Sequence, residues 1–181
     1  MLTGTKSLPD NLVIRPARPE DDGFLKSLYR SERNDLRMID AEDDFIEELI
    51  GIQYLAKTQG YATMFPAAMY FLIERLGVPI GRLVVNFGHD AVRLVDIAFV
   101  PEARGHGYGT HVIKAVQFAA ARIQAPVALT VSHDNASARR AYSALGFLVE
   151  WSDAITDHLV WHPGGGDTCL NSAIADFQNR P

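Results

Sequence analysis

Two periods of hydrophobic positions divide the chain into predicted helices and strands. Apolar residues at three- and four-residue steps predict helices over residues 20–34, 41–57, 107–123 and 135–145. Runs rich in β-branched and aromatic residues predict strands over residues 11–17, 68–75, 80–87, 91–100, 127–132, 147–151 and 158–162. The chain is therefore predicted to mix strands and helices along its length.

Short turns join three consecutive predicted strands in the middle of the chain. Gly77-Val78-Pro79 separates the first two strands, and Gly88-His89-Asp90 separates the second from the third, which predicts an antiparallel meander. The strand, helix and strand from Ala91 to Ser132 predict a parallel pair with a right-handed crossover. We expect an α/β fold of the α+β type, with a mixed, mainly antiparallel central sheet of about six to seven strands flanked by about four helices.

The pattern of predicted elements continues without a linker from residue 11 to residue 162. A chain of 181 residues has the length of one domain. Residues 1–10 are polar, and we expect a flexible N-terminus there. Residues 163–181 contain three consecutive glycines and form a predicted C-terminal appendage. It would pack on the domain or on a partner subunit through residues at helical spacing, namely Leu170, Ile174 and Phe177.

Composition narrows the classes of function. The formal net charge is −5, which disfavours nucleic-acid binding because that binding depends on neutralising phosphates. No apolar run reaches 18 residues, and the first residues lack the apolar core of a signal peptide, so we expect neither a membrane span nor a leader. Cys169 is the single cysteine, which excludes an internal disulfide and a Cys/His metal cluster. A cytoplasmic location is the expectation that fits these observations.

One glycine-rich segment lies where a predicted strand gives way to a helix. It runs from Arg104 to Thr110 and reads RGHGYGT. Gly105, Gly107 and Gly109 lack side chains, so backbone N–H groups can approach an anion. Those donors and the helix dipole attract phosphate, and Arg104 adds charge-assisted hydrogen bonds. The segment predicts a phosphate-binding loop, with a glycine-rich turn that binds no ligand as the alternative.

Two nucleotide-binding signatures fit this loop poorly. The P-loop needs Gly-Lys-Ser/Thr after its first glycine and four further residues, and no lysine stands at that position. The dinucleotide signature spaces its glycines as G-x-G-x-x-G and has an acidic residue about twenty positions later. Here the spacing is G-x-G-x-G, and Leu129-Thr130-Val131 occupies the later position. A nucleotide-binding protein remains the weaker alternative.

A second motif follows on the next predicted strand and helix. Residues Asn135 to Tyr142 read NASARRAY, and Leu145-Gly146-Phe147 comes after them. Together with R-x-x-G-x-G from Arg104 to Gly109, this motif closely resembles the GNAT family of N-acetyltransferases. The strand before the loop and the hairpin ahead of it are also similar to that family. The resemblance covers about residues 12–161.

The resemblance implies a binding site for acetyl-CoA and no metal. The backbone of Ile97, Phe99 and Val100 would pair with the pantetheine arm. Asn135 would hydrogen-bond the pantetheine region, with Ser137 and Ala138 lining it. The main-chain N–H groups of the loop would hold the pyrophosphate, namely those of Arg104, Gly105, His106, Gly107, Tyr108, Gly109 and Thr110.

The resemblance also implies that an acetyl group moves from acetyl-CoA to a primary amine by direct attack on the thioester. A backbone N–H near Phe99 would stabilise the charge that develops on the carbonyl oxygen. Tyr142 would act as the general acid that protonates the departing thiolate, and core packing is the alternative for its ring. A catalytically inactive acyl-CoA-binding sensor or interaction module is the alternative for the whole protein.

The residue that removes a proton from the amine is less clear in the sequence. Asp96 is a candidate base, but its parity relative to Phe99 favours a structural role, such as holding Arg93. Thr130 stands where many family members carry a carboxylate and cannot serve as a base. His133 is a second candidate, with an ordinary turn position as its alternative. Loss of the amine proton through water is an alternative of equal standing to any of these residues.

The acceptor is expected to be an amine of a small molecule or a peptide. Aromatic residues in the predicted acceptor region would line a pocket or belong to the core, namely Tyr54, Tyr61, Phe65 and Tyr70. Charged residues near the first helix would contact the acceptor or form a solvated helix face, namely Glu32, Arg33 and Arg37. A homodimer is compatible with the sequence.

Overall fold

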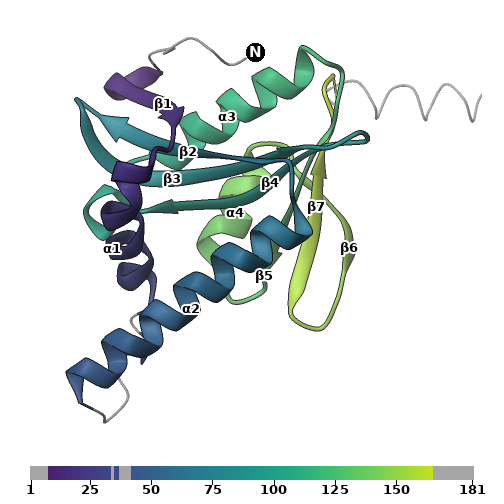
Figure 1. Ribbon diagram of the computed structural model, residues 1–181. Coiled ribbons are helices and arrows are strands. Elements are labelled where there is room, and N and C mark those ends of the chain that lie inside the picture. Colours follow the sequence, from purple (N-terminus) through teal and green to yellow (C-terminus); the bar gives the residue numbers. More distant parts are fainter. Residues whose placement is uncertain (1–7, 34, 37–41, 165–181) are drawn as a thin grey trace, which may run out of the picture. The chain divides into compact units, whose positions relative to one another are not determined.

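A computed structural model describes residues 8–33, 35–36 and 42–164, and Figure 1 labels the elements. The helices are α1 (Asp22–Glu32), α2 (Asp43–Met64), α3 (Tyr108–Ala121) and α4 (Ala136–Ala144). The strands are β1 (Leu12–Pro16), β2 (Ala68–Arg75), β3 (Val78–Phe87), β4 (Val92–Phe99), β5 (Val127–Ser132), β6 (Leu148–Ser152) and β7 (Thr156–Trp161). Short 3-10 turns are η1 (Pro9–Asn11), η2 (Pro19–Asp21) and η4 (Pro101–Ala103).

The seven strands form one sheet in the order β1-β2-β3-β4-β5-β7-β6. The pairs β1/β2, β2/β3, β5/β7 and β6/β7 are antiparallel. The structure therefore confirms the predicted fold class, a mixed α/β fold with helices beside a mainly antiparallel sheet. The predicted flexible N-terminus lies outside the described residues up to residue 7, and so does the predicted appendage beyond residue 164.

Most element boundaries lie within three residues of their predicted positions, but the end of α2 does not. The apolar spacing predicts an end near Lys57, whereas α2 continues to Met64. Gly60 and the polar residues around it conceal the continuation in the sequence. Tyr61 lies two turns beyond the buried Tyr54 and repeats its position on the inward face of the helix.

The described residues gather into two compact units. The first comprises the chain up to Gly88 together with Leu94–Val112, and the second comprises His89–Arg93 and the chain from Ile113 onward. The first unit holds β1, β2, β3, most of β4 and the helices α1 and α2. The second holds β5, β6, β7, α4 and most of α3.

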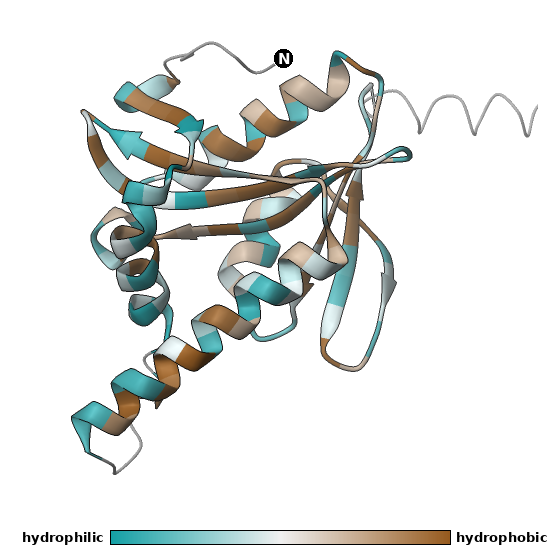
Figure 2. Ribbon diagram, in the orientation of Figure 1, coloured by the Kyte–Doolittle hydropathy of each residue, from teal (hydrophilic) through white to brown (hydrophobic). Residues whose placement is uncertain are grey.

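In the first unit, the inward faces of α1 and α2 share a buried cluster of Tyr29, Leu36, Ile46, Ile50 and Tyr54. The rings of Tyr29 and Tyr54 lie 5.7 Å apart at a tilt of 52°. Figure 2 shows that hydrophobic residues also dominate β2 and β3. The side chains buried there stabilise the sheet through the removal of apolar surface from water.

Arg15 joins β1 to the start of α1. Its Nη1 and Nη2 donate to the two carboxylate oxygens of Asp21 at 2.7 and 2.8 Å, and its Nε donates to Glu74 at 2.7 Å. The bond from Arg15 is the main reason that the pKa of Asp21 falls to about 2. The paired charges fix the turn η2 and therefore the point at which α1 begins.

In the second unit, β7 lies between β5 and β6. Val127, Leu129 and Leu159 are buried on these strands, whereas all five residues of β6 are exposed. Gln117 on α3 donates from its side-chain amide to the carbonyl of Leu145 at 2.9 Å. That bond ties the end of α4 to α3, because the last carbonyls of a helix have no partner within it.

Candidate functional site

The loop from Arg104 to Gly107 leads directly into α3, which begins at Tyr108. Gly105 and Gly107 have φ values of +76° and +81°, a region that side chains disfavour. No other atom lies within 4 Å of the position where a Cβ would stand at either glycine. The backbone is therefore open at both residues, next to the N–H groups of the first helical turn.

Side chains of the first unit hold this loop in place. Arg104 Nε donates to the carbonyl of Phe99 at 2.9 Å, and His106 Nδ1 contacts the carbonyl of Arg104 at 2.8 Å. The His106 ring stacks on Tyr108 at 5.5 Å, and the Arg75 guanidinium lies 5.5 Å from that tyrosine ring. These contacts give the loop a defined conformation.

The end of β4 leads into the loop and packs closely on β3. A Cβ on Gly81 would lie 2.5 Å from the carbonyl oxygen of Ala98, so only glycine allows this approach. The N–H of Val100 donates to the carbonyl of Ile80 at 2.9 Å. The carbonyl of Val100 accepts a hydrogen bond from the N–H of Ala103 at 2.9 Å, so both backbone groups of Val100 are bonded within the first unit, and only the second lone pair of the carbonyl is left for a ligand.

In the second unit, Asn135 caps the N-terminus of α4. Its side-chain oxygen accepts a hydrogen bond from the N–H of Ala138 at 3.1 Å, which satisfies one of the free donors of the first turn. Ser137 is exposed on the same turn, and Ala138 is half-buried. Asn135, Ser137 and Ala138, three of the predicted pantetheine-contacting residues, thus lie together at the start of one helix.

Tyr142 is buried two turns further along α4. Its ring meets Phe147 edge-on, with 5.6 Å between the ring centres. The N–H groups of Leu145 and Phe147 both donate to the carbonyl of Tyr142. This packing fixes the position of the ring, and it is compatible both with the predicted general acid and with the packing alternative.

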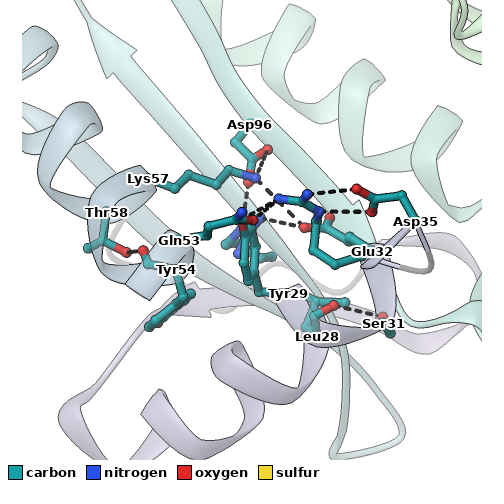
Figure 3. Close-up of polar contacts among 12 residues, drawn as sticks. Leu28, Tyr29, Ser31, Glu32, Asp35, Gln53, Tyr54, Lys57, Thr58 and Asp96 are labelled. Atoms are coloured by element: carbon teal, nitrogen blue, oxygen red, sulfur yellow. Dashed lines mark hydrogen bonds and ion pairs between the residues drawn. The ribbon is translucent and has the colours of Figure 1, made fainter. Parts of the chain in front are cut away.

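Asp96 lies in a network of charged side chains in the first unit, shown in Figure 3. Arg82 Nε donates to its Oδ2 at 2.5 Å, and Lys57 Nζ lies 3.4 Å from its Oδ1. Glu32 completes the network, 3.3 Å from Arg82 and 3.7 Å from Lys57. Two cations and two carboxylates, drawn from α1, α2, β3 and β4, therefore balance one another.

Burial and charge shift the pKa values within this network in a consistent direction. Burial acts to lower the pKa of Arg82, but the charges of Asp96 and Glu32 outweigh it and leave the pKa above its usual value. For the Tyr61 hydroxyl, whose charged form is an anion, burial raises the pKa, and the charge of Asp96 raises it further. Arg82 is thus held as a cation and Tyr61 as a neutral phenol.

The network corrects two expectations from the sequence. The arginine that holds Asp96 is Arg82, on β3, and not the suggested Arg93. The interpretation of Glu32 and Arg33 as a solvated helix face is also wrong, because Glu32 pairs with Arg82 while Arg33 bonds Gln53 and Tyr29. Arg37 lies outside the described residues. The sequence did carry a signal for Arg82, a single cation within an apolar strand.

Among the predicted acceptor-region aromatics, Tyr54 belongs to the buried cluster and its hydroxyl donates to Asp22 at 3.3 Å. Tyr61, Phe65 and Tyr70 are half-buried. The Tyr61 ring lies 5.6 Å from the ammonium of Lys57. The core interpretation therefore applies to Tyr54, and Tyr61 borders the charged network.

His133 lies at the end of β5 and contacts a buried carboxylate. Its Nε2 is 3.0 Å from Oδ1 of Asp157, which also accepts a hydrogen bond from the Ser152 hydroxyl at 2.7 Å. Arg139 approaches the second oxygen of Asp157 at 2.7 Å. The bond from Ser152 is the largest of the effects that lower the pKa of Asp157. His133 is therefore oriented by a specific partner.

Within the described part of the chain, no helix is long and apolar enough to cross a membrane. The same residues contain no group of three or more histidine, cysteine, aspartate or glutamate side chains that would hold a metal ion.

Many solved structures share this fold, including the following three acetyltransferases. The PaiA N-acetyltransferase of Thermoplasma acidophilum, solved with coenzyme A, aligns with a TM-score of 0.63 and 18% identity, over 83% of this chain and 98% of that one. The spermidine N-acetyltransferase of Vibrio cholerae, solved with coenzyme A and spermine, aligns with a TM-score of 0.59 and 18% identity, over 84% of this chain and 96% of that one. The ribosomal-protein-S5-alanine acetyltransferase of Vibrio fischeri aligns with a TM-score of 0.57 and 14% identity, over 84% of this chain and 93% of that one.

The sequence itself identifies the family. No protein among those with curated functions matches the chain. The family model described as the acetyltransferase (GNAT) family matches residues 25–147, which include β4, the loop, α4 and Tyr142. The predicted resemblance is confirmed, and the chain belongs to the GNAT family of acetyltransferases.

Proposed function

We propose that this protein is an N-acetyltransferase that moves an acetyl group from acetyl-CoA to a primary amine. The single observation that carries the proposal is the loop before α3. Gly105 and Gly107 open its backbone where the helix N-terminus offers N–H groups, and the match of the family model over this loop supports coenzyme A as its ligand. Solved structures of the same fold contain coenzyme A.

The residues of the loop fit a pyrophosphate group. The N–H groups from Gly105 to Thr110 would donate to its oxygens, and the free space at both glycines would admit them, whereas the N–H of Arg104 already donates to the carbonyl of Pro101 at 3.2 Å. Arg104 is exposed and would add positive charge while its Nε stays on the carbonyl of Phe99. Bound acetyl-CoA supplies an acetyl group activated as a thioester.

The remaining cofactor contacts are assigned residue by residue. The backbone of Ile97 and Phe99 would pair with the pantetheine arm. Val100 would contribute only the second lone pair of its carbonyl, because Ile80 binds its N–H and Ala103 donates to the same carbonyl. Asn135 would contact the arm through its side-chain amide nitrogen, since its oxygen caps α4. Ser137 and Ala138 would line the arm from the first turn of that helix.

Tyr142 is the proposed general acid for the departing thiolate. An unperturbed phenol titrates near pH 10 and a thiol near pH 8.5, so the fixed position of Tyr142 contributes more than its acidity does. Asp96 is better assigned as the counter-ion of Arg82 than as a base, because two cations hold its carboxylate. The amine would lose its proton through water.

The proposed acceptor is a primary amine of a small molecule or a peptide. Proteins of the same fold carry names that refer to spermidine and to a ribosomal protein. Their identity to this chain is too low to transfer either substrate, so the acceptor class is the open part of the proposal. A panel of polyamines, amino acids and peptides with free N-termini would identify the class of acceptor.

Cofactor binding is tested with a matched pair of variants. Gly107→Val places a side chain over the loop, and Gly77→Val imposes the same left-handed strain in the turn between β2 and β3, where φ is +78°. Calorimetry should show that coenzyme A binding weakens at least tenfold in Gly107→Val only. Equal binding by the two variants would remove the loop from the site. Stronger binding of ATP or NAD than of coenzyme A would favour a nucleotide-binding protein.

Turnover is tested by thiol release from acetyl-CoA over the amine panel. If Tyr142 is the acid, Tyr142→Phe should lower kcat about 10²-fold or more and leave coenzyme A affinity near its original value. An unchanged kcat would return Tyr142 to a packing role. Coenzyme A binding without thiol release from any amine would instead support the inactive sensor.

A further inference from the structure

Helix α2 carries a second apolar face in addition to the one that packs in the first unit. Ile46, Ile50 and Tyr54 are buried, whereas Phe45 and Ile52 are 57% exposed and Leu55 is 56% exposed. At 100° per residue, the exposed set points roughly 170° away from the buried set. Figure 2 shows hydrophobic residues recurring along this helix. An ordinary surface helix has only one such face.

The exposed residues follow the spacing of a helix that pairs with another helix. Steps of three, four, three, four and three residues lead through one row, namely Phe45, Glu48, Ile52, Leu55, Gln59 and Ala62. This alternation is the repeat of the two core positions in a coiled coil. We call these six residues the outer row of α2, and each of them is exposed.

The outer row is complementary to itself when two copies run antiparallel. About a two-fold axis between residues 53 and 54, Ile52 faces Leu55 of the other copy. In the next layer outward, Glu48 faces Gln59, whose amide can donate to the carboxylate. In the last layer, the large Phe45 faces the small Ala62. Each of the six positions is therefore matched in size or polarity, as an isologous interface requires.

The charges on α2 favour the same arrangement. The N-terminal half carries Asp43, Asp44, Glu48 and Glu47, of which Glu47 pairs with Arg30 of α1. Residues 56–64 contain no acidic side chain, and the ammonium of Lys57 in that range contacts Asp96 and Glu32 within the same copy. A parallel pair would bring the acidic halves together, and an anionic membrane surface would repel them. An antiparallel pair places each acidic half beside a half without acidic residues.

From these observations, we propose that the outer row of α2 is the interface of a homodimer formed by antiparallel pairing of two α2 helices. One helix from each copy buries less than the roughly 1,600 Å² of a standard interface. The dimer should therefore dissociate in the micromolar range and depend on protein concentration. The proposal is independent of acetyl transfer.

Analytical ultracentrifugation of the full chain over a range of concentrations tests the interface. Ile52→Glu should convert the protein to a monomer at concentrations at which the original chain is dimeric. The matched control is Ile123→Glu, because Ile123 is an isoleucine 60% exposed beyond the end of α3. The control should stay dimeric. A chain that is monomeric at every concentration, or a dimer that Ile52→Glu leaves intact, overturns the proposal.

Charge rescue tests the register. Leu55→Lys alone should also be monomeric, but an equimolar mixture of Ile52→Glu and Leu55→Lys should dimerise, since the two substituted side chains face each other. In a Cys169→Ser background, Glu48→Cys mixed with Gln59→Cys should form a crossed disulfide. Disulfides of Glu48→Cys with itself would indicate a parallel pair and contradict the proposal. Loss of the dimer in Val149→Glu, but not in Ile52→Glu, would assign the interface to β6 instead.

Discussion

Each unit of the molecule pairs an aspartate with an arginine, but the two arrangements differ in burial and in what surrounds the pair. In the first unit the arginine, Arg82, is buried, whereas in the second the aspartate, Asp157, is buried. Asp96 shares its oxygens with Arg82 and Lys57, and Glu32 balances the second cation. Asp157 accepts a hydrogen bond from a hydroxyl and contacts Arg139 and His133. The first network joins α1, α2, β3 and β4, and the second joins the β6–β7 hairpin to α4 and to the end of β5.

The difference concerns the kinds of side chain in each network. The network around Asp96 consists of two cations and two carboxylates, which balance one another. Only the cluster around Asp157 contains a histidine, His133. A fixed network is suited to holding α1 and α2 on the sheet. The cluster around Asp157 is suited to orienting His133.

The largest expected effect comes from removing Arg82. Arg82→Met removes the buried cation and leaves the half-buried Asp96 and Glu32 without their main partner, so the cost should approach that of a broken buried ion pair, about 3–5 kcal/mol. Urea unfolding measures the change. Arg93→Met is the matched control, because Arg93 lies on the neighbouring strand and is half-buried. A control that costs as much as Arg82→Met would contradict the assignment of Arg82 as the partner of Asp96.

A double variant sharpens that result. Asp96→Asn in the Arg82→Met background removes one of the stranded carboxylates, so it should recover part of the lost unfolding free energy. No recovery would mean that Arg82 acts through packing of its stem and not through charge.

A smaller and pH-dependent effect is expected at Asp157. The pKa of this carboxyl is lowered in the folded protein, chiefly by the Ser152 hydroxyl. The stability it contributes is therefore present above the unfolded pKa near 3.8 and is lost as the pH falls through the folded value. Asp157→Asn should lower Tm by a few degrees at pH 7, and the difference from the original chain should close in acid. A constant difference from pH 7 to pH 3 would exclude a role for the charge.

Local patterns were enough to predict the loop, the strands and most of the helices. Gly105 and Gly107 predict open backbone from their residue type alone, and the aromatic and β-branched residues of β2 predict a strand without knowledge of distant residues. Asn135 at a helix start is also a local signal, although its capping of Ala138 was not predicted.

The partners of Asp96 could not be read from the sequence in the same way. Lys57 and Arg82 are 39 and 14 residues away from it, and they approach it only because α2 and β3 pack beside β4. The second apolar face of α2 could not be recognised in the sequence either. Apolar residues on two opposite faces of one helix weaken the three- and four-residue periodicity that marks a single face. Contacts between distant segments depend on tertiary packing, which no local spacing records.

The smallest effect is expected at Lys57. Its ammonium lies 3.4 Å from Asp96 and 3.7 Å from Glu32, and the side chain keeps 27% of its exposure. Contacts of this length with partial access to water contribute less than about 1 kcal/mol. Lys57→Met should therefore lower the unfolding free energy only slightly, with the exposed Lys114→Met as the control for loss of a positive charge. If Lys57→Met were as costly as Arg82→Met, the two cations would hold the carboxylates equally. A small loss would show that Arg82 is the residue around which the network is organised.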